Sequence, residues 1–332
     1  MNFKTNCMGN QRIKLRYVDT MSRDYKNEVL WQLLNQWFDI DEESEPDYVV
    51  SGGMGTSFTK FKNSVLIQII GENIVPDFNM FDYAIGFDYM DFDDRYIRVP
   101  LYVFYDSYQS LIRRDKIIDK QNACSRKFCS YVVSNANYAD PTRDNFFQEL
   151  CKYKRVDSAG RHLNNMGGGY LKDKLDFISN YKFNIAFENC ASIGYTTEKI
   201  MEPMVVNTIP IYWGNPRISD DFNKESFVCL SDFDTVEACI KYIERLDNDD
   251  DLYYEKLSKS WFNSEKVIDY NKRLELFFQN IFKQDIRFAK RVNIYGRQSQ
   301  LKSKLYDFYK ANGERTLKNR LKKGILNFLR KD

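Results

Sequence analysis

The chain has 332 residues and a formal net charge of +2, so it is long enough for two domains and lacks the overall positive charge of a nucleic-acid-binding protein. It contains no run of about 18 apolar residues, and residues 1–20 are polar, so we expect neither a membrane-spanning helix nor a secretory signal. Its seven cysteines form no regular framework, which predicts reduced thiols. Because His162 is the single histidine, a Ser-His-Asp triad is not expected, and a general base would be a carboxylate.

The first half of the chain alternates between helical and strand patterns. Residues 27–38 carry the apolar spacing of an amphipathic helix, whereas residues 48–50, 65–70 and 82–87 are patterned as short apolar strands. The glycine-rich residues 51–55 lack the Lys-Ser/Thr of a phosphate-binding loop, so we expect a plain turn there.

Two acidic positions follow these strands. Glu72 comes directly after residues 65–70, where it would either face a ligand crevice or lie in a solvated turn. The acidic loop at residues 88–94 contains Asp91-Phe92-Asp93, formally an Asp-x-Asp pattern that can hold a divalent metal but also arises by chance. The residues alone leave both alternatives open.

The middle of the chain has a cation at an unusual place. Residues 127–134 are patterned as a strand, and a helix is expected from Thr142 or Arg143 to Tyr153. Because helix N-termini favour acidic residues, Arg143 in the first turn is either a tolerated surface cation or part of an anion site. We place a domain boundary near residues 150–156. Later strands are expected at 155–158 and 227–230, and helices at 171–180, 236–246, 252–260 and 272–282.

Residues 182–216 have the pattern of a ligand-binding edge. An apolar strand at 183–187 ends at Glu188-Asn189, a helix is expected to begin around Thr197, and residues 209–213 form a second strand. Strand, polar loop and helix N-terminus are how an α/β domain presents a nucleotide site. The side chains suit a nucleotide-sugar: Lys199 for a diphosphate, Glu198 for a vicinal diol, and Tyr195 and Asn189 for ring and hydrogen-bond contacts.

These residues resemble the donor motifs of glycosyltransferase family 10, the α-1,3/4-fucosyltransferases, and most closely the bacterial branch that makes Lewis-type antigens. The resemblance rests on Phe187-Glu188-Asn189, Tyr195-Thr196-Thr197-Glu198-Lys199 and Ile209-Pro210-Ile211-Tyr212-Trp213-Gly214. Upstream it includes Gly71-Glu72-Asn73, residues 81–88, 94–96 and 100–102, and Ser134-Asn135 followed by Arg143, so that it spans roughly residues 64–235.

The resemblance implies an α/β fold of the GT-B architecture, with two Rossmann-like domains facing a central cleft. It places an acceptor-binding domain at 1–153, a GDP-sugar donor-binding domain at 154–295 and a basic helical tail at 296–332. It also implies inverting transfer of L-fucose from GDP-β-L-fucose, with Glu72 as the general base. Arg143 and Lys199 would neutralise the diphosphate, so no metal or other cofactor would be required. The donor-binding positions it marks are Arg143, Asn189, Tyr195, Glu198 and Lys199.

Two features bear on the details. Pro203 follows Glu198-Lys199 and cannot donate a backbone hydrogen bond, so a kink or an early helix end is expected. Residues 315–331 contain seven Lys/Arg and no acid, with apolar residues on one helical face. This tail would either pack on the body or lie in the plane of an anionic membrane, and we favour the membrane interpretation over nucleic-acid binding. The expected location is the cytoplasmic face of the inner membrane.

The acceptor and the regiochemistry stay open at this stage. We expect an N-acetyllactosamine-like oligosaccharide or glycolipid and an α-1,3 linkage. The alternatives are another GDP-sugar, transfer to a 4-hydroxyl, or a non-catalytic glycan- or membrane-binding relative. The sequence does not indicate an oligomeric state.

Overall fold

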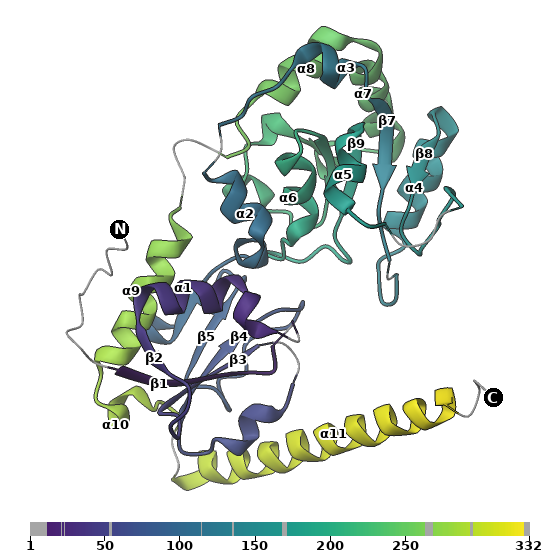
Figure 1. Cartoon of the computed structure of the whole chain (residues 1–332). Coiled ribbons are helices and arrows are strands. Elements are labelled where there is room, and N and C mark those ends of the chain that lie inside the picture. Colours follow the sequence, from purple (N-terminus) through teal and green to yellow (C-terminus); the bar gives the residue numbers. More distant parts are fainter. Residues whose placement is uncertain are drawn as a thin grey trace. The chain divides into compact units, whose positions relative to one another are not determined.

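The computed structural model describes residues 12–20, 22, 24–52, 55–113, 115–134, 136–167, 171–262, 268–292 and 295–328, with side chains up to residue 313. The chain divides into two compact units. The first combines Met1–Val99 with Asp269–Asp332, and the second is Pro100–Ile268. Each unit has a parallel β-sheet with helices around it (Figure 1).

The sheet of the first unit has the strand order β2-β1-β3-β4-β5-β6, and all its neighbouring strands are parallel. Its strands are β1 (Arg12–Val18), β2 (Asp39–Asp41), β3 (Tyr48–Gly52), β4 (Val65–Ile69), β5 (Tyr83–Gly86) and β6 (Tyr96–Arg98). Strand β1 lies inside this sheet and was not among the strands predicted from the sequence. Its Ile13, Leu15 and Tyr17 are buried in alternation with charged residues, the two-residue period of a strand.

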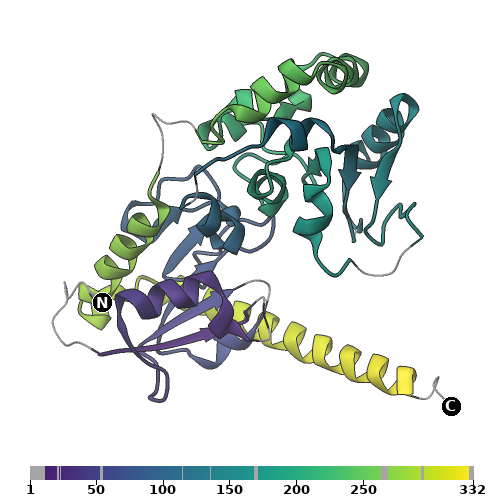
Figure 2. The same cartoon turned by 45° about the horizontal axis from the view of Figure 1, so that its top comes forward.

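Helices from both ends of the chain cover this first sheet. They are α1 (Val29–Trp37), α9 (Tyr270–Lys283), α10 (Ile286–Ala289) and α11 (Gly296–Phe328), with 3-10 turns η1 (Tyr25–Asn27), η2 (Ser57–Lys60) and η3 (Asp93–Arg95). In α9, the ring of Phe282 lies 5.0 Å from that of Phe38 and 4.7 Å from that of Tyr48. The α11 helix is one continuous rod in Figures 1 and 2, and its Tyr306 packs into an apolar cluster with Phe58 of η2.

The second unit has the strand order β11-β10-β9-β7-β8, again with parallel pairing throughout. The strands are β7 (Lys127–Tyr131), β8 (Val156–Ser158), β9 (Tyr181–Phe187), β10 (Ile209–Trp213) and β11 (Val228–Cys229). Its helices are α2 (Asp106–Leu111), α3 (Lys120–Cys124), α4 (Thr142–Tyr153), α5 (Lys174–Ser179), α6 (Glu198–Val205), α7 (Val236–Asn248) and α8 (Asp250–Ser258). Its 3-10 turns are η4 (Leu101–Phe104), η5 (Ile218–Asp220), η6 (Lys224–Ser226) and η7 (Leu230–Asp232).

The division between the units differs from the expected boundary at 153/154. Strand β7 pairs with β9, with Ser130 opposite Asn184, so residues 100–153 belong with the donor motifs. Residues 269–295 return to the first unit, where the carboxylate of Asp82 accepts backbone hydrogen bonds from Arg291 at 2.8 Å and Val292 at 2.7 Å. Strand pairing and a buried carboxylate between distant segments decide this division, and neither is visible in a local pattern.

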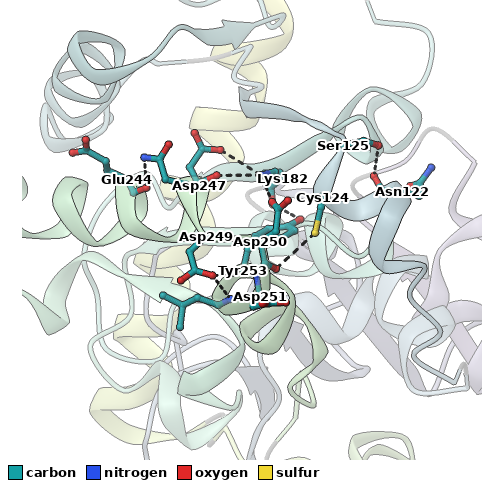
Figure 3. A network of polar contacts seen from close by, with 12 residues as sticks. Asn122, Cys124, Ser125, Lys182, Glu244, Asp247, Asp249, Asp250, Asp251 and Tyr253 are labelled. Carbon is teal, nitrogen blue, oxygen red and sulfur yellow. Dashed lines mark hydrogen bonds and ion pairs between the residues drawn. The ribbon is translucent and has the colours of Figure 1, made fainter.

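Strand β9 is fixed at its amino end by a buried lysine. The ammonium of Lys182 donates to the carbonyl of Asp247 at 3.2 Å and to the carboxylate of Asp250, also at 3.2 Å (Figure 3). Lys182 also lies over the ring of Tyr253, with the ammonium 5.2 Å from the ring centroid. These contacts hold the α7–α8 turn against the start of β9, the strand that ends at Glu188-Asn189.

Candidate active site

The donor motifs gather where the strand order of the second sheet reverses. From β7 the chain continues to β8 on one side, whereas β9 lies on the other side of β7. Ligands of open α/β sheets bind at such a switch point, outside the carboxyl ends of the strands. Arg143 follows β7 and Asn189 follows β9, so the topology itself brings these two predicted residues together.

Arg143 is a buried cation in the first turn of α4. Its side chain is 1% exposed, and one terminal nitrogen donates to the side-chain oxygen of Asn189 at 2.6 Å. A backbone bond from Asp140 to the carbonyl of Asn189, at 2.7 Å, joins the same two loops. The Nε atom of Arg143 is buried without a hydrogen-bond partner, and no carboxylate among the described residues pairs with this guanidinium. Since an unpaired buried charge is costly, the arrangement suits an anionic ligand.

The start of α4 is held by its own carboxylates. Asp140 accepts a hydrogen bond from the backbone of Thr142 at 2.8 Å, and the bonds from Thr142 lower the pKa of Asp140. In the first turn of the helix, the carboxylate of Asp144 lies 2.8 Å from Nε2 of His162, the single histidine. His162 therefore helps to hold the start of α4 in place.

Lys199 lies in the first turn of α6 and is already paired within the protein. Its ammonium is 3.2 Å from a carboxylate oxygen of Glu188 and 3.8 Å from one of Glu198, and it donates to the hydroxyl of Thr197 at 3.0 Å. Burial works against the charge of Lys199, but Glu188 and Glu198 outweigh burial and raise its pKa. The lysine is thus a charged group held in one position.

Glu198 and Tyr195 are less accessible than the sequence suggested. Burial would raise the pKa of Glu198, but the ammonium groups of Lys199 and Lys174 outweigh it and lower the pKa, so the carboxylate is ionised. Burial and the charge of Glu198 in turn raise the pKa of Tyr105. Tyr195 is also buried, so its assignment to donor binding stays a prediction.

Two residues that sequence reasoning did not select organise the site. Glu188 is 0% exposed and receives the hydrogen bonds of Thr197 and Lys199. Asn215 is buried after β10, accepts from the backbone of Gly194 at 2.8 Å and donates to the hydroxyl of Thr196 at 3.1 Å. Glu188 directly follows β9 and Asn215 comes two residues after β10, positions at strand ends that could have marked them as candidates.

Pro203 has the predicted effect on α6. The helix ends at Val205, two residues after the proline, and Thr208 returns a backbone hydrogen bond to the carbonyl of Pro203 at 2.9 Å. The turn leads directly into β10. The helix therefore consists of little more than the two turns that carry Glu198 and Lys199.

Glu72 belongs to the first unit, whereas the predicted donor residues belong to the second. It follows the buried strand β4, its side chain is exposed, and its carbonyl accepts a turn hydrogen bond from Ile74 at 2.8 Å. The Asp91-Phe92-Asp93 motif forms a local turn in which Asp91 accepts from the backbone of Asp93 at 3.3 Å. Within the described part of the chain, no three His, Cys, Asp or Glu side chains are arranged to hold a metal ion.

Residues 123–307 match the glycosyltransferase family 10 (fucosyltransferase) C-terminal domain. Residues 15–105 match the N-terminal domain of alpha-(1,3)-fucosyltransferase FucT. The chain therefore belongs to glycosyltransferase family 10, and the resemblance seen in its motifs is confirmed.

Individual relatives agree with this assignment. The alpha-(1,3)-fucosyltransferase FucT of Helicobacter pylori is 33% identical over 314 residues, which cover 82% of this chain and 63% of that protein. The chain therefore spans less than two thirds of the length of that relative. A crystal structure of an alpha1,3-fucosyltransferase has a TM-score of 0.73 at 32% identity and covers 85% of this chain and 93% of its own. A structure of an alpha1,3-fucosyltransferase with GDP-fucose has a TM-score of 0.69 at 30% identity, with coverages of 82% and 91%.

The expected fold class is also confirmed, since both units have the parallel α/β organisation of these fucosyltransferases, which are of the GT-B class. Among the helices that the structure describes, none is both long and apolar enough to cross a membrane. The side chains of the basic tail, from residue 314 onward, lie outside the described residues, as do Asn135 and residues 329–332.

Proposed function

We propose that the chain is an inverting α-1,3-fucosyltransferase that moves L-fucose from GDP-β-L-fucose to a hydroxyl of an N-acetyllactosamine-like glycan. The acceptor oxygen attacks the anomeric carbon while the bond from that carbon to the diphosphate breaks. Glu72 takes the acceptor proton as a general base, and GDP leaves. Membership of the family and the complex of a similar fucosyltransferase with GDP-fucose support this reaction.

The observation that carries the proposal is the buried guanidinium of Arg143. It lies at the switch point, it is held by Asn189, and it has no carboxylate partner among the described residues. A diphosphate would supply the missing charge and accept from the unsatisfied Nε atom. Lys199 adds a second cation at the N-terminus of α6, where backbone N–H groups also favour an anion.

Glu72 as the base is supported by its place and its accessibility. It comes three residues after the end of the buried parallel strand β4, and its exposed carboxylate is available to a hydroxyl. We propose that Arg143 and Lys199 together neutralise the departing diphosphate, so that transfer needs no metal ion. We assign three further residues to donor binding, Asn189, Tyr195 and Glu198. Because Tyr195 is buried, it would form part of the wall of the donor site.

We also propose that the basic tail attaches the protein to the anionic cytoplasmic face of the inner membrane. Support comes from the composition of residues 315–331 and from the helical conformation of α11 up to Phe328. The acceptor would then be a glycan or glycolipid displayed at that surface.

One assay tests the proposed reaction. The protein is incubated with GDP-fucose and lactose or N-acetyllactosamine isomers, with and without EDTA, and the linkage is determined by NMR. We expect an α-1,3-linked product and the same rate in EDTA. A 4-linked product would correct the regiochemistry, and transfer only from another GDP-sugar would correct the donor. GDP binding without any transfer would favour a non-catalytic glycan-binding relative.

A further inference from the structure

Glu188 is a carboxylate buried directly at the donor edge, with both oxygens bonded. One oxygen accepts from the backbone N–H of Thr197 at 2.7 Å. The other accepts from the Thr197 hydroxyl at 2.8 Å and from the ammonium of Lys199 at 3.2 Å. The backbone of Glu188 continues the sheet through a 2.8 Å bond to the carbonyl of Trp213. Because both carboxylate oxygens have hydrogen-bond partners, the free-energy cost of burying the carboxylate of Glu188 is offset.

The neighbouring strand leaves room for this carboxylate. Gly214 follows β10 with a φ of 155°, a conformation that residues other than glycine rarely adopt. A Cβ atom at this position would lie 2.5 Å from Cγ of Glu188. The glycine is therefore required both by its backbone conformation and by the side chain of Glu188 beside it.

Glu188 is bonded to the start of α6 through Thr197 and Lys199. Thr197 is the N-cap of this helix, and its hydroxyl accepts from the backbone of Lys199. We propose that Glu188 is a positioning residue that holds the helix cap and the Lys199 ammonium in one geometry, so that the lysine meets a nucleoside diphosphate without reorganising. The proposal rests on the proposed function, because the diphosphate is the leaving group of that reaction.

Glu188 is better placed for this role than Glu198, the other carboxylate near Lys199. Its oxygen is nearer to the ammonium, at 3.2 Å compared with 3.8 Å. The side chain of Glu188 is 0% exposed and that of Glu198 is 22% exposed, so Glu198 keeps a face for a ligand. Among the described residues, other ionisable groups also lie near Lys199 and Glu188. Glu202 and Lys174 form an ion pair with each other. Three tyrosines are also nearby, namely Tyr105, Tyr195 and Tyr212.

The ion pair with Glu188 also affects the pKa of Lys199. Burial by itself would lower the pKa of Lys199, and Glu188 is foremost among the groups that raise it. With Glu188 present, the raised pKa keeps the ammonium charged through neutral and mildly alkaline pH. Without Glu188, burial is opposed mainly by Glu198, so the pKa falls and the charge is lost as the pH rises through the lowered value.

The experiment measures GDP affinity by isothermal titration calorimetry between about pH 7.5 and 9, each variant being expressed relative to wild type. Glu188→Gln should weaken GDP about tenfold at pH 7.5 and progressively more as the pH rises. Adding Lys199→Arg to Glu188→Gln should remove the extra pH dependence, because a guanidinium stays charged. Glu202→Gln is the matched control: it removes a charge from the same helix, leaves the Lys199–Glu188 pair intact and should parallel wild type.

The outcomes separate this inference from the proposed function. A general loss of structure would weaken GDP equally at every pH and would not respond to Lys199→Arg, which overturns the positioning role. Should Glu188→Gln fail to fold, Glu188→Asp carries the test: it keeps the charge but shortens the side chain, so it should weaken GDP without adding pH dependence. If wild type does not bind GDP, the proposed function itself is wrong, and the role of Glu188 falls with it.

Discussion

Each unit has a glutamate that follows a buried parallel strand, and the two glutamates have opposite surroundings. Each follows a buried parallel strand and precedes an asparagine, as Gly71-Glu72-Asn73 after β4 and Phe187-Glu188-Asn189 after β9. The side chain of Glu72 is exposed, whereas Glu188 is fully buried and bonded to Thr197 and Lys199.

The end of a strand places each carboxylate, whereas the elements packed around it determine what the carboxylate can do. An exposed carboxylate can exchange a proton with a substrate, because water and ligand reach it. A buried carboxylate bonded to a cation is worth most as a fixed charge that orients its partner. We therefore expect Glu72 to take part in proton transfer and Glu188 to position Lys199.

The largest effect should come from removing the exposed carboxylate. Glu72→Gln keeps the shape of the side chain but cannot accept the acceptor proton, so kcat should fall by about 10²–10⁴-fold. GDP affinity should stay at the wild-type value, since Glu72 is not assigned to the donor. Steady-state kinetics and calorimetry measure the two quantities, and a variant that retains normal turnover would remove Glu72 as the base.

The next contrast concerns the two cations of the donor site. Lys199→Met leaves Glu188 buried without its cation and should lower the free energy of unfolding by about 3–5 kcal/mol. Arg143→Met removes a buried guanidinium that has no carboxylate partner within the described residues, so we expect a change below about 1 kcal/mol.

Both of these variants should weaken GDP about ten- to hundredfold, as expected for a lost hydrogen bond to a charged group. Chemical denaturation and calorimetry together test the contrast. Equal destabilisation by the two substitutions would mean that Arg143 has an internal counter-charge after all.

A smaller effect should follow from crowding Glu188 without removing it. Gly214→Ala introduces a Cβ atom against Glu188 and an unfavourable φ, so it should destabilise the protein by about 2–3 kcal/mol and also weaken GDP. Gly167→Ala is a useful control, because Gly167 also has a positive φ but a Cβ atom there would meet no atom of the described residues within 4 Å. That control should lose stability but keep its GDP affinity.

The smallest effect on catalysis is expected at the tail. Deleting residues 315–332 should abolish binding to vesicles that contain anionic lipids and leave kcat on soluble acceptors unchanged within about twofold. Sedimentation with vesicles and a soluble-acceptor assay measure the two properties. Vesicle binding that survives the deletion would rule out the tail as the anchor.

Local sequence patterns were sufficient to predict many of the strands and helices and the chemistry of individual side chains. Apolar runs predicted β3, β4, β5, β7, β9 and β10, because buried parallel strands are continuously apolar. The helix start at Thr197 and the early end after Pro203 follow from capping and from the missing proline N–H, both local properties. The motif series was also sufficient to identify the family.

Which of these elements contact one another depends on long-range packing, and this is seen in the fold alone. The pairing of β7 with β9 moved Arg143 into the donor unit and beside Asn189, and packing of α9 returned the chain to the first sheet. Packing likewise buries Glu188 beside Lys199 and leaves Glu72 exposed. Both glutamates nevertheless follow a strand and precede an asparagine in the sequence. Strand order and burial arise from contacts between residues far apart in the chain, so a local pattern cannot distinguish the two glutamates.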